Sequence, residues 1–269
     1  MILTKKNKII FLNCIFFLLT LNLFCQTNQK TYNDLIKYIE SENVSNSEKI
    51  IAIDNLIDLT KKNNNKEDEF RLLELKSLYT ESDISLILSD ELLDIANELK
   101  NDSLIEIALS NKSSILYTQR NFKDALYYSL KALKINKSTN NRFELYGSLI
   151  DIGNIYYNIQ DYNNAEYYFN YALNNLKLDK KFIESQGHLL LLYNLGKVYW
   201  KTNNTDKLSK KIKDIDELIS KETNITDIAY LNYLESGFLY LRKDYNNSIS
   251  YLNKSIDIIR KMTTMLMNT

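Results

Sequence analysis

The sequence predicts an all-α fold built from repeated pairs of helices, and two observations lead to this expectation. One thirteen-residue pattern occurs three times, as NFKDALYYSLKAL at 121–133, DYNNAEYYFNYAL at 161–173 and DYNNSISYLNKSI at 244–256. The chain also has no proline and only 5 glycines in 269 residues, which favours long helices joined by polar turns over a loop-rich or all-β fold. A catalytic motif normally occurs once, whereas a motif that recurs with drifting polar positions specifies packing.

The first 26 residues have the features of a secretory signal peptide. Three lysines within the first eight residues precede the apolar run 9–24, and a polar segment follows it. As a helix this run spans about 24 Å, short of the ~30 Å hydrocarbon core of a bilayer. We therefore expect a signal peptide over residues 1–26, cleaved near Cys25. Two alternatives stay open: lipid modification of Cys25, against which the preceding Phe24 argues, and an uncleaved membrane anchor. The expected location is the periplasm of a Gram-negative bacterium.

Charge and chemistry-bearing residues exclude several classes of function. Lys+Arg and Asp+Glu both total 34, so no overall field attracts nucleic acid. Both cysteines lie within the first 25 residues, and His188 is the only histidine, which excludes a histidine-metal cluster and a histidine-based triad. His188 is interpreted as a packing residue at the start of a helix. The sequence has no glycine-rich phosphate loop and no nucleophile elbow. We expect no enzyme, no cofactor, no metal and no nucleic-acid partner.

Upstream of the repeated segment lies a second recurring pattern. In one copy it consists of Leu149, Ile152, Gly153 and Tyr156, followed by Ala165, Phe169 and Ala172, and in the next copy of Leu192, Leu195, Gly196 and Tyr199. This order resembles the tetratricopeptide repeat, a pair of helices with the signature W-x2-L-G-x2-Y followed by A-x3-F. Counted from the first signature position, units begin near residues 66, 106, 146, 189 and 229.

The resemblance implies a right-handed α-solenoid of five to six helix pairs over residues 66–269, after a partial repeat at 27–65. Neither helix of a pair hides its apolar stripe alone, so neighbouring pairs share one core. Gly153 and Ala165 are expected where the two helices of a pair cross. The units are longer than the minimal 34 residues, and the additions are placed after the second helix, for example in LKNDS at 99–103. The units at 106 and 229 depart from the signature, with Ser113 and Ser236 at the glycine position.

In tetratricopeptide proteins the first helix of each pair lines a concave groove, so the resemblance also implies a binding surface. Position 12 of four consecutive units is aromatic: Tyr117, Tyr157, Trp200 and Tyr240. The other groove residues implied by the family's helix positions are Asn154, Asn158, Tyr193 and Lys197, together with Ile150, Lys201 and Tyr233. Aromatic rings with polar tips suit binding surfaces. The alternative is that the rings at position 12 serve packing alone.

The function implied is that of a non-catalytic, exported adaptor or scaffold that binds a protein or peptide in its concave groove. The alternative is a truncated periplasmic sensor region of a histidine kinase or a helix-turn-helix signalling protein. Solenoids usually end in a polar capping helix, and the segment after the last repeat shows none. Three outcomes are open: a shortened product, self-association through the uncapped C-terminal repeat, or folding back of residues such as Met262, Leu266 and Met267.

Overall fold

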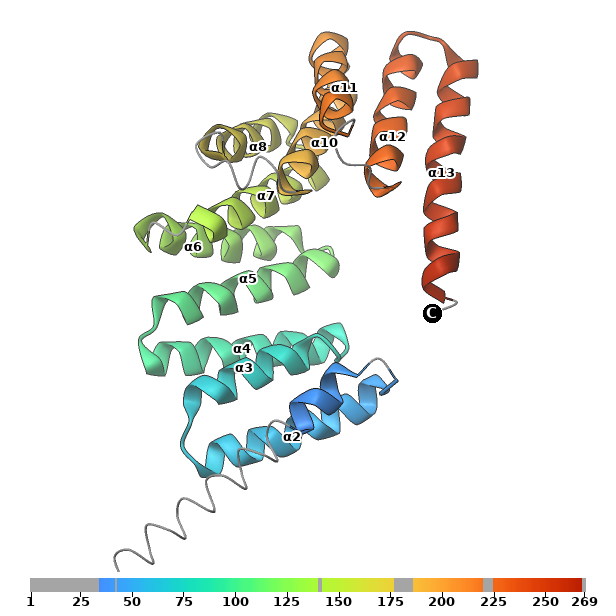
Figure 1. Cartoon of the computed structure of the whole chain (residues 1–269). Helices are drawn as coiled ribbons and strands as arrows, with labels where there is room; N and C mark the ends of the chain where they lie inside the picture. Colours follow the sequence, from blue (N-terminus) through green and yellow to red (C-terminus); the bar gives the residue numbers. More distant parts are fainter. Residues whose placement is uncertain (1–33, 42, 140–141, 177–185, 220–224, 268–269) are drawn as a thin grey trace, which may run out of the picture. The chain divides into compact units, whose positions relative to one another are not determined.

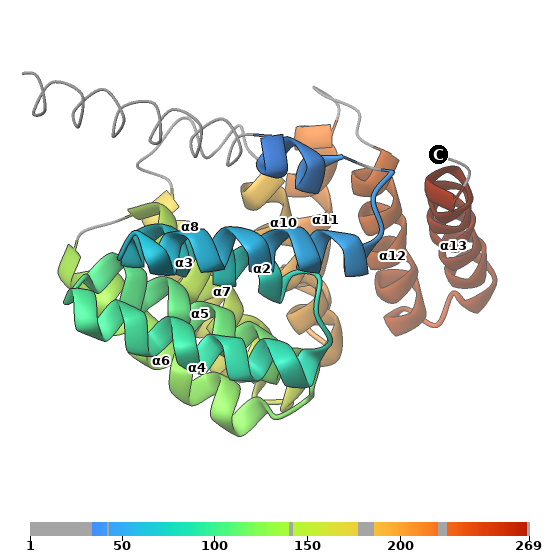
Figure 2. The same cartoon turned by 90° about the horizontal axis from the view of Figure 1, so that it is seen from below.

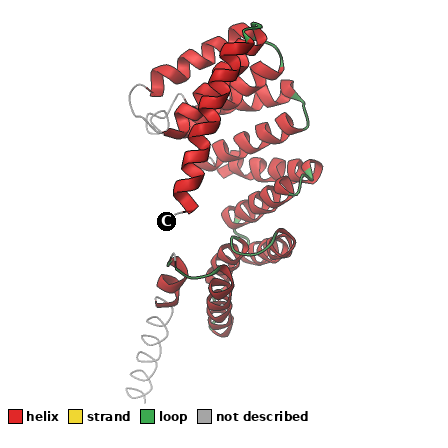
Figure 3. Ribbon diagram, turned by 90° about the vertical axis from the view of Figure 1, so that its right-hand side faces the viewer, coloured by secondary structure: helices red, strands yellow, loops and turns green. Residues whose placement is uncertain are grey.

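The computed structural model describes residues 34–41, 43–139, 142–176, 186–219 and 225–267. Every regular element in these ranges is a helix (Figure 3). The predicted signal peptide lies outside them and stays a prediction. No helix within the described ranges combines the length and the apolar character needed to cross a membrane. The chain divides into two compact units, residues 1–108 and 109–269, and the boundary falls inside one helix.

The first unit packs a short helix over residues 34–40, three longer helices and the start of a further helix around an aliphatic core. The longer helices are α2 (Asn46–Lys62), α3 (Lys66–Ser77) and α4 (Ser82–Leu99), and the further helix is α5 (Asp102–Thr118), of which the first residues belong to this unit. Helix α2 begins at a capping box, in which the backbone N–H of Ser45 donates to Glu48 Oε2 at 3.0 Å and the N–H of Glu48 donates to Ser45 Oγ at 3.4 Å. Leu56, Phe70 and Leu92 are buried in the core that these helices share.

The second unit consists of the remainder of α5 and a series of helical hairpins. Its other helices are α6 (Phe122–Thr139), α7 (Arg142–Asn158), α8 (Tyr162–Leu176), α10 (Gln186–Lys201), α11 (Thr205–Ile219), α12 (Ile225–Leu241) and α13 (Tyr245–Met267). Helix α7 packs on α8, α10 on α11 and α12 on α13, and the last pair lies side by side in both Figure 1 and Figure 2. The first helices α7, α10 and α12 also contact one another in sequence order. Leu149, Ile152 and Leu195 are fully buried in the shared core.

Each hairpin of the second unit turns in the same way. The second residue after the first helix is left-handed at Arg120, Gln160, Asn203 and Lys243, at steps of 40, 43 and 40 residues. In the second hairpin the N–H of Gln160 donates to the carbonyl of Tyr157 at 3.1 Å, and that of Asp161 to the carbonyl of Tyr156 at 2.9 Å. The side chain of Asp161 then caps α8 by accepting from the N–H of Asn164 at 3.1 Å. The repeat seen in the sequence is therefore also a repeat of backbone geometry.

Part of the length added to the units lies in the first turns of the first helices. Helices α7, α10 and α12 begin at Arg142, Gln186 and Ile225, three or four residues before the start of the sequence pattern. The segment LKNDS, expected as an added loop, is a tight turn in which Lys100 is left-handed and the N–H of Asn101 donates to the carbonyl of Ala96 at 3.3 Å. A polar sequence alone does not separate a solvated loop from the exposed first turn of a helix.

Small residues let the two helices of a pair approach at their crossing. A Cβ built on Gly153 would lie 2.5 Å from Phe169 Cε1, and Ala165 is fully buried. Where the signature lacks glycine, a buried hydroxyl takes its place: Ser113 Oγ donates to the carbonyl of Ala125 at 2.8 Å and lies 2.6 Å from Ser129 Oγ. The departures from the signature therefore replace close packing by buried hydrogen bonds at the same crossing.

Candidate functional site: an aromatic face around Lys197

The first helices of three successive hairpins bring their aromatic side chains together on one surface. We define this aromatic face by Tyr157 of α7, Tyr193, Lys197 and Trp200 of α10, and Tyr230 and Tyr233 of α12. Tyr193 stacks on Tyr230 with ring centroids 4.4 Å apart, and Trp200 meets Tyr233 edge to face at 4.9 Å. Residues three and four apart share one side of a helix, so the positions within α10 and within α12 already favour this arrangement. The contacts between helices come from stacking of the hairpins.

Lys197 lies at the centre of the aromatic face. Its Nζ is 5.0 Å from the ring centroid of Tyr157 and 5.0 Å from that of Tyr193, within the range of cation–π attraction. Within the described residues no carboxylate forms an ion pair with it. Burial lowers the pKa of Lys197 to about 8. The ammonium is therefore held against aromatic rings, partly shielded from water and without a negative partner.

Burial favours the neutral form of Tyr157, Tyr193 and Tyr233 on the face. Burial raises the pKa of Tyr157 to about 12, with smaller contributions from Tyr233 and Tyr162. Burial also raises the pKa of Tyr193 and of Tyr233. Their hydroxyls therefore remain donors and acceptors of hydrogen bonds over the physiological pH range, and the charge of the face comes from Lys197 alone.

The rings at position 12 also have a packing role. Tyr117 meets Phe122, Tyr157 meets Tyr162 and Tyr240 meets Tyr245, each pair edge to face with centroids 5.6 Å apart. In each case the second ring begins the following helix, so the pair fixes the turn of the hairpin. Trp200 has Thr205 at the equivalent place and packs instead across α12, where a Cβ on Gly237 would clash with its ring. The packing alternative thus accounts for these contacts, and binding by the same rings stays a prediction.

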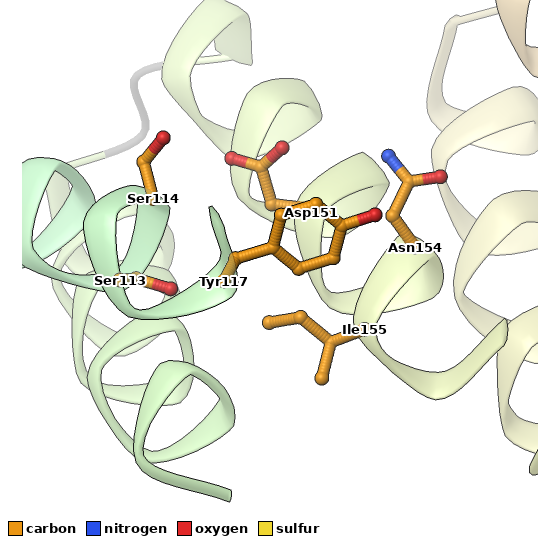
Figure 4. A pocket seen from close by; sticks show the side chains of 6 residues that line it. All are labelled: Ser113, Ser114, Tyr117, Asp151, Asn154 and Ile155. Atoms are coloured by element: carbon orange, nitrogen blue, oxygen red, sulfur yellow. The ribbon is translucent and has the colours of Figure 1, made fainter. Parts of the chain in front are cut away.

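A small pocket adjoins the aromatic face between α5 and α7. Tyr117 of α5 points toward Asp151 and Asn154 of α7 in a pocket of about 60 Å³ (Figure 4). Next to it, Asn158 Nδ2 donates to the hydroxyl of Tyr117 at 2.7 Å and to the carbonyl of Asn154 at 2.8 Å. Three predicted groove residues, Tyr117 of α5 and Asn154 and Asn158 of α7, therefore meet in one polar patch. Its volume leaves room for a water molecule or two and for nothing the size of a peptide side chain.

The structure separates the predicted site residues into three groups. Tyr157, Tyr193, Lys197 and Trp200 join the aromatic face, whereas Tyr117, Asn154 and Asn158 form the polar patch. Tyr240, 56% exposed, contacts Tyr245, and within the described ranges its ring contacts no ring of the aromatic face. Sequence reasoning missed Tyr230, although it occupies position 2, one of the family's groove positions. Applying the same positional rule to the last unit would have found it.

The described part of the chain holds no candidate metal centre. No group of three or more His, Cys, Asp or Glu side chains in this part could hold a metal ion. His188 lies in the first turn of α10, in the place expected for a helix-start residue. Asn194, at a position where some tetratricopeptide proteins bind a ligand's carboxylate, is 2% exposed and its Nδ2 has no hydrogen-bond partner. It is buried in the core and does not face a ligand on the surface.

Comparison with known proteins identifies the fold. The sequence matches no protein-family model and no curated protein. Among solved structures, the chain is similar to apo RapI, with a TM-score of 0.61 and 16% identity over 81% of this chain and 78% of that one. It is also similar to a STAND signal transduction ATPase with a tetratricopeptide repeat sensor from Pyrococcus horikoshii, with a TM-score of 0.60 and 16% identity over 87% of this chain and 40% of the other. A putative kinesin light chain with TPR-like repeats from Podosopora anserina gives a TM-score of 0.51 and 10% identity over 79% and 96% of the two chains.

The chain has a tetratricopeptide-repeat fold. This confirms the resemblance drawn from the Leu-Gly signature and the recurring segment. At these identities the similarity establishes the fold alone.

Proposed function

We propose that the chain is a non-catalytic, exported tetratricopeptide-repeat protein that binds a protein or peptide partner across its aromatic face. The observation that carries the proposal is Lys197, a cation between two tyrosine rings that has no ion-pair partner among the described residues. A structural lysine of a scaffold normally extends into water or pairs with a carboxylate. A partner that places an anionic or carbonyl oxygen at this ammonium would complete its interactions.

The chemistry of the face suits an extended peptide. Aromatic rings supply contact area with few rotatable bonds, and their hydroxyls supply hydrogen bonds along the surface. With 34 basic and 34 acidic residues, long-range attraction is weak, so shape and local contacts decide the affinity. The expected ligand is a segment with apolar side chains on both sides of an acidic residue or a chain-terminal carboxylate.

The experiment selects peptides from a displayed random library against the purified chain and measures their affinity for two lysine variants. Lys197→Met keeps the length and apolar stem of the side chain and removes its charge. Lys131→Met on α6 is the matched control, because Lys131 is exposed and its Nζ also lies over a tyrosine ring, 4.4 Å from the centroid of Tyr127. The proposal expects Lys197→Met to weaken the selected peptides at least tenfold and Lys131→Met to leave them unchanged. Peptides that bind both variants like the parent would contradict it.

Truncating Trp200 is a less informative test, because its ring fills the space above Gly237 and its loss disturbs the packing of α10 on α12. A tyrosine of a second helix is a more useful control. Tyr127 on α6 is 53% exposed and is not one of the side chains that form the aromatic face, and Lys131 Nζ lies 4.4 Å from its ring centroid. Tyr127→Ala should leave peptide binding intact, which separates groove binding from general adhesion to tyrosine-rich surfaces.

A sensor region is the second candidate, favoured by one comparison. The chain aligns with 40% of the STAND ATPase whose repeats are described as a sensor. In that case the same aromatic face binds the signal, and the response is carried by an output module. Reading the neighbouring DNA for an in-frame membrane segment and a kinase or DNA-binding module distinguishes the two candidates.

Export is part of the proposal and has its own test. It is supported by the lysines and the apolar run of the first 24 residues. Fractionation of cells that express the full chain should recover a product shortened by roughly 26 residues in the periplasm, by the length of the predicted signal peptide. A full-length product in the membrane fraction would favour the anchor, and a full-length product in the cytoplasm would contradict export.

Self-association is proposed through an apolar stripe on α13. Helix α13 continues without a break to Met267, so the residues after Met262 do not fold back over the last hairpin. The exposed large side chains on this helix are Tyr245, Ile249, Ile256 and Ile259. They lie on one side of the helix and form the face on which a further hairpin would stack in a solenoid.

A further inference from the structure

Helix α12 carries polar residues at two positions where α7 and α10 carry buried aliphatic ones. Positions 4 and 7 of a first helix face the preceding hairpin. In α7 and α10 these positions are Leu149, Ile152, Leu192 and Leu195, all buried. In α12 they are Asn232 and Glu235, both only partly buried.

The preceding helix carries a matching change. Position 28, in the second helix of a unit, is Leu133 in α6 and Leu173 in α8, and both are buried in the core. In α11 the same position is Asp216. Three repeat positions that are aliphatic in the preceding hairpins are therefore polar here. They carry the amide of Asn232 and the carboxylates of Glu235 and Asp216, and all three lie where α11 contacts α12.

These side chains line a cavity instead of a packed interface. It has a volume of about 510 Å³ and lies between α11, α12 and the start of α13. Its polar lining includes Asp216, Asn232 and Glu235, and its apolar lining includes Ile212, Leu231 and Phe238. Volumes of about 300–1,000 Å³ with apolar walls and a few convergent polar groups are typical of small-molecule sites.

The two carboxylates of the cavity lack a counter-ion among the described residues. Burial raises the pKa of Glu235, and the neighbouring charge of Asp216 raises it further. Lys213 also lines the cavity, but its side chain is 78% exposed and its Nζ lies 3.8 Å from Glu217, on the outer side of α11. A half-buried carboxylate is unfavourable beside a second, solvent-exposed carboxylate, and a cation bound between Glu235 and Asp216 would relieve both the burial and the repulsion.

We propose that this cavity binds a small organic cation, a primary ammonium or guanidinium carried on an apolar body. The ammonium lies between the carboxylates of Asp216 and Glu235, the amide of Asn232 adds a hydrogen bond, and the hydrocarbon part packs on Phe238 and Ile212. A bare metal ion would leave the apolar walls without a partner. The site is separate from the aromatic face and does not depend on peptide binding there.

Calorimetric titration of the purified chain with 2-phenylethylamine tests this proposal, with 2-phenylethanol as the neutral probe of the same shape. The amine should bind and raise the melting temperature, and the alcohol should do neither. Glu235→Gln and Asp216→Asn keep the shape of the cavity and should each weaken the amine at least tenfold. Asp214→Asn, on the same helix but outside the cavity, should bind like the parent.

A second variant keeps the test decisive if the first variants fold poorly. The double replacement Asp216→Leu with Glu235→Leu restores the residues of the neighbouring hairpins, so it should melt at a higher temperature and bind no amine. Absence of amine binding by the folded parent would overturn the proposal, as would equal binding of the alcohol or full binding by Glu235→Gln. A further variant, Lys221→Met, changes a lysine that lies outside the described residues. If only this variant binds the amine, the chain's own lysine occupies the cavity. That result would also overturn the proposal.

Discussion

The close crossing of α7 and α8 can be tested at a single atom. Replacing Gly153 by alanine adds one methyl group, which would lie 2.5 Å from Cε1 and 2.7 Å from Cδ1 of Phe169. Phe169 is 1% exposed and packed in the core, so its ring cannot move aside without displacing neighbours. The same helix contains Gly147, an exposed residue whose added Cβ would meet nothing within 4 Å. The two glycines therefore form a matched pair.

The magnitudes follow from two opposing effects. Alanine stabilises a helix interior by about 1 kcal/mol relative to glycine. Overpacking of a core typically costs about 1–3 kcal/mol. Gly147→Ala experiences the first effect alone and should stabilise by about 1 kcal/mol. Gly153→Ala combines the helix stabilisation with the overpacking cost. Its free energy of unfolding should therefore be between unchanged and about 2 kcal/mol lower than that of the parent. Because the helix effect cancels, the difference between the variants measures the cost of the close crossing, about 1–3 kcal/mol.

Urea unfolding followed by circular dichroism gives the two free energies of unfolding, provided that the slopes stay equal to that of the parent. A second replacement, Phe169→Leu, makes room at the crossing. In its background Gly153→Ala should lose most of its cost, which a double-mutant cycle detects as coupling. If Gly153→Ala stabilises the chain as much as Gly147→Ala does, the helices do not approach as described and the assigned register is wrong.

Three further predictions concern charge, turn geometry and assembly. Folding lowers the pKa of Lys197 from 10.5 to about 8. Between these two pH values the unfolded chain keeps a proton on Lys197 that the folded chain has released. The free energy of unfolding should therefore rise as the pH increases above 8. We expect a gain of about 1–2 kcal/mol between pH 8 and pH 10 in urea titrations, absent in Lys197→Met; parallel profiles for both chains would refute this. Gln160 has a φ of 65°, so Gln160→Gly should stabilise by about 1 kcal/mol and Gln160→Val should destabilise, as thermal melts can show; equal melts would contradict the left-handed turn. Ile249→Glu with Ile256→Glu should lower the sedimenting mass if the stripe on α13 joins two copies, and an unchanged monomer in the parent would end that proposal.

The hairpins and their turns could be predicted from the sequence because they depend on residues close in the chain. The stripe formed by Leu149, Ile152 and Tyr156 specifies one side of a helix, and Asp161 caps the next helix whatever else surrounds it. The Gly153–Ala165 crossing follows from the same local spacing. The extent of the first helices did not follow, because a polar segment such as 99–103 is compatible with both a loop and an exposed helical turn.

Only the tertiary structure decided which side chains of different hairpins meet. The sequence placed Tyr157, Tyr193 and Lys197 on first helices, but their common site exists because α7 and α10 stack at one particular distance and rotation. The sequence also has Asp216 at the repeat position of Leu173, and Glu235 at the repeat position of Leu195. Each change looks like ordinary drift when its repeat is considered by itself. Periodicity within a helix is a property of neighbouring residues, whereas a ring cluster or a cavity depends on how separate helices pack, and that packing is set by the whole core.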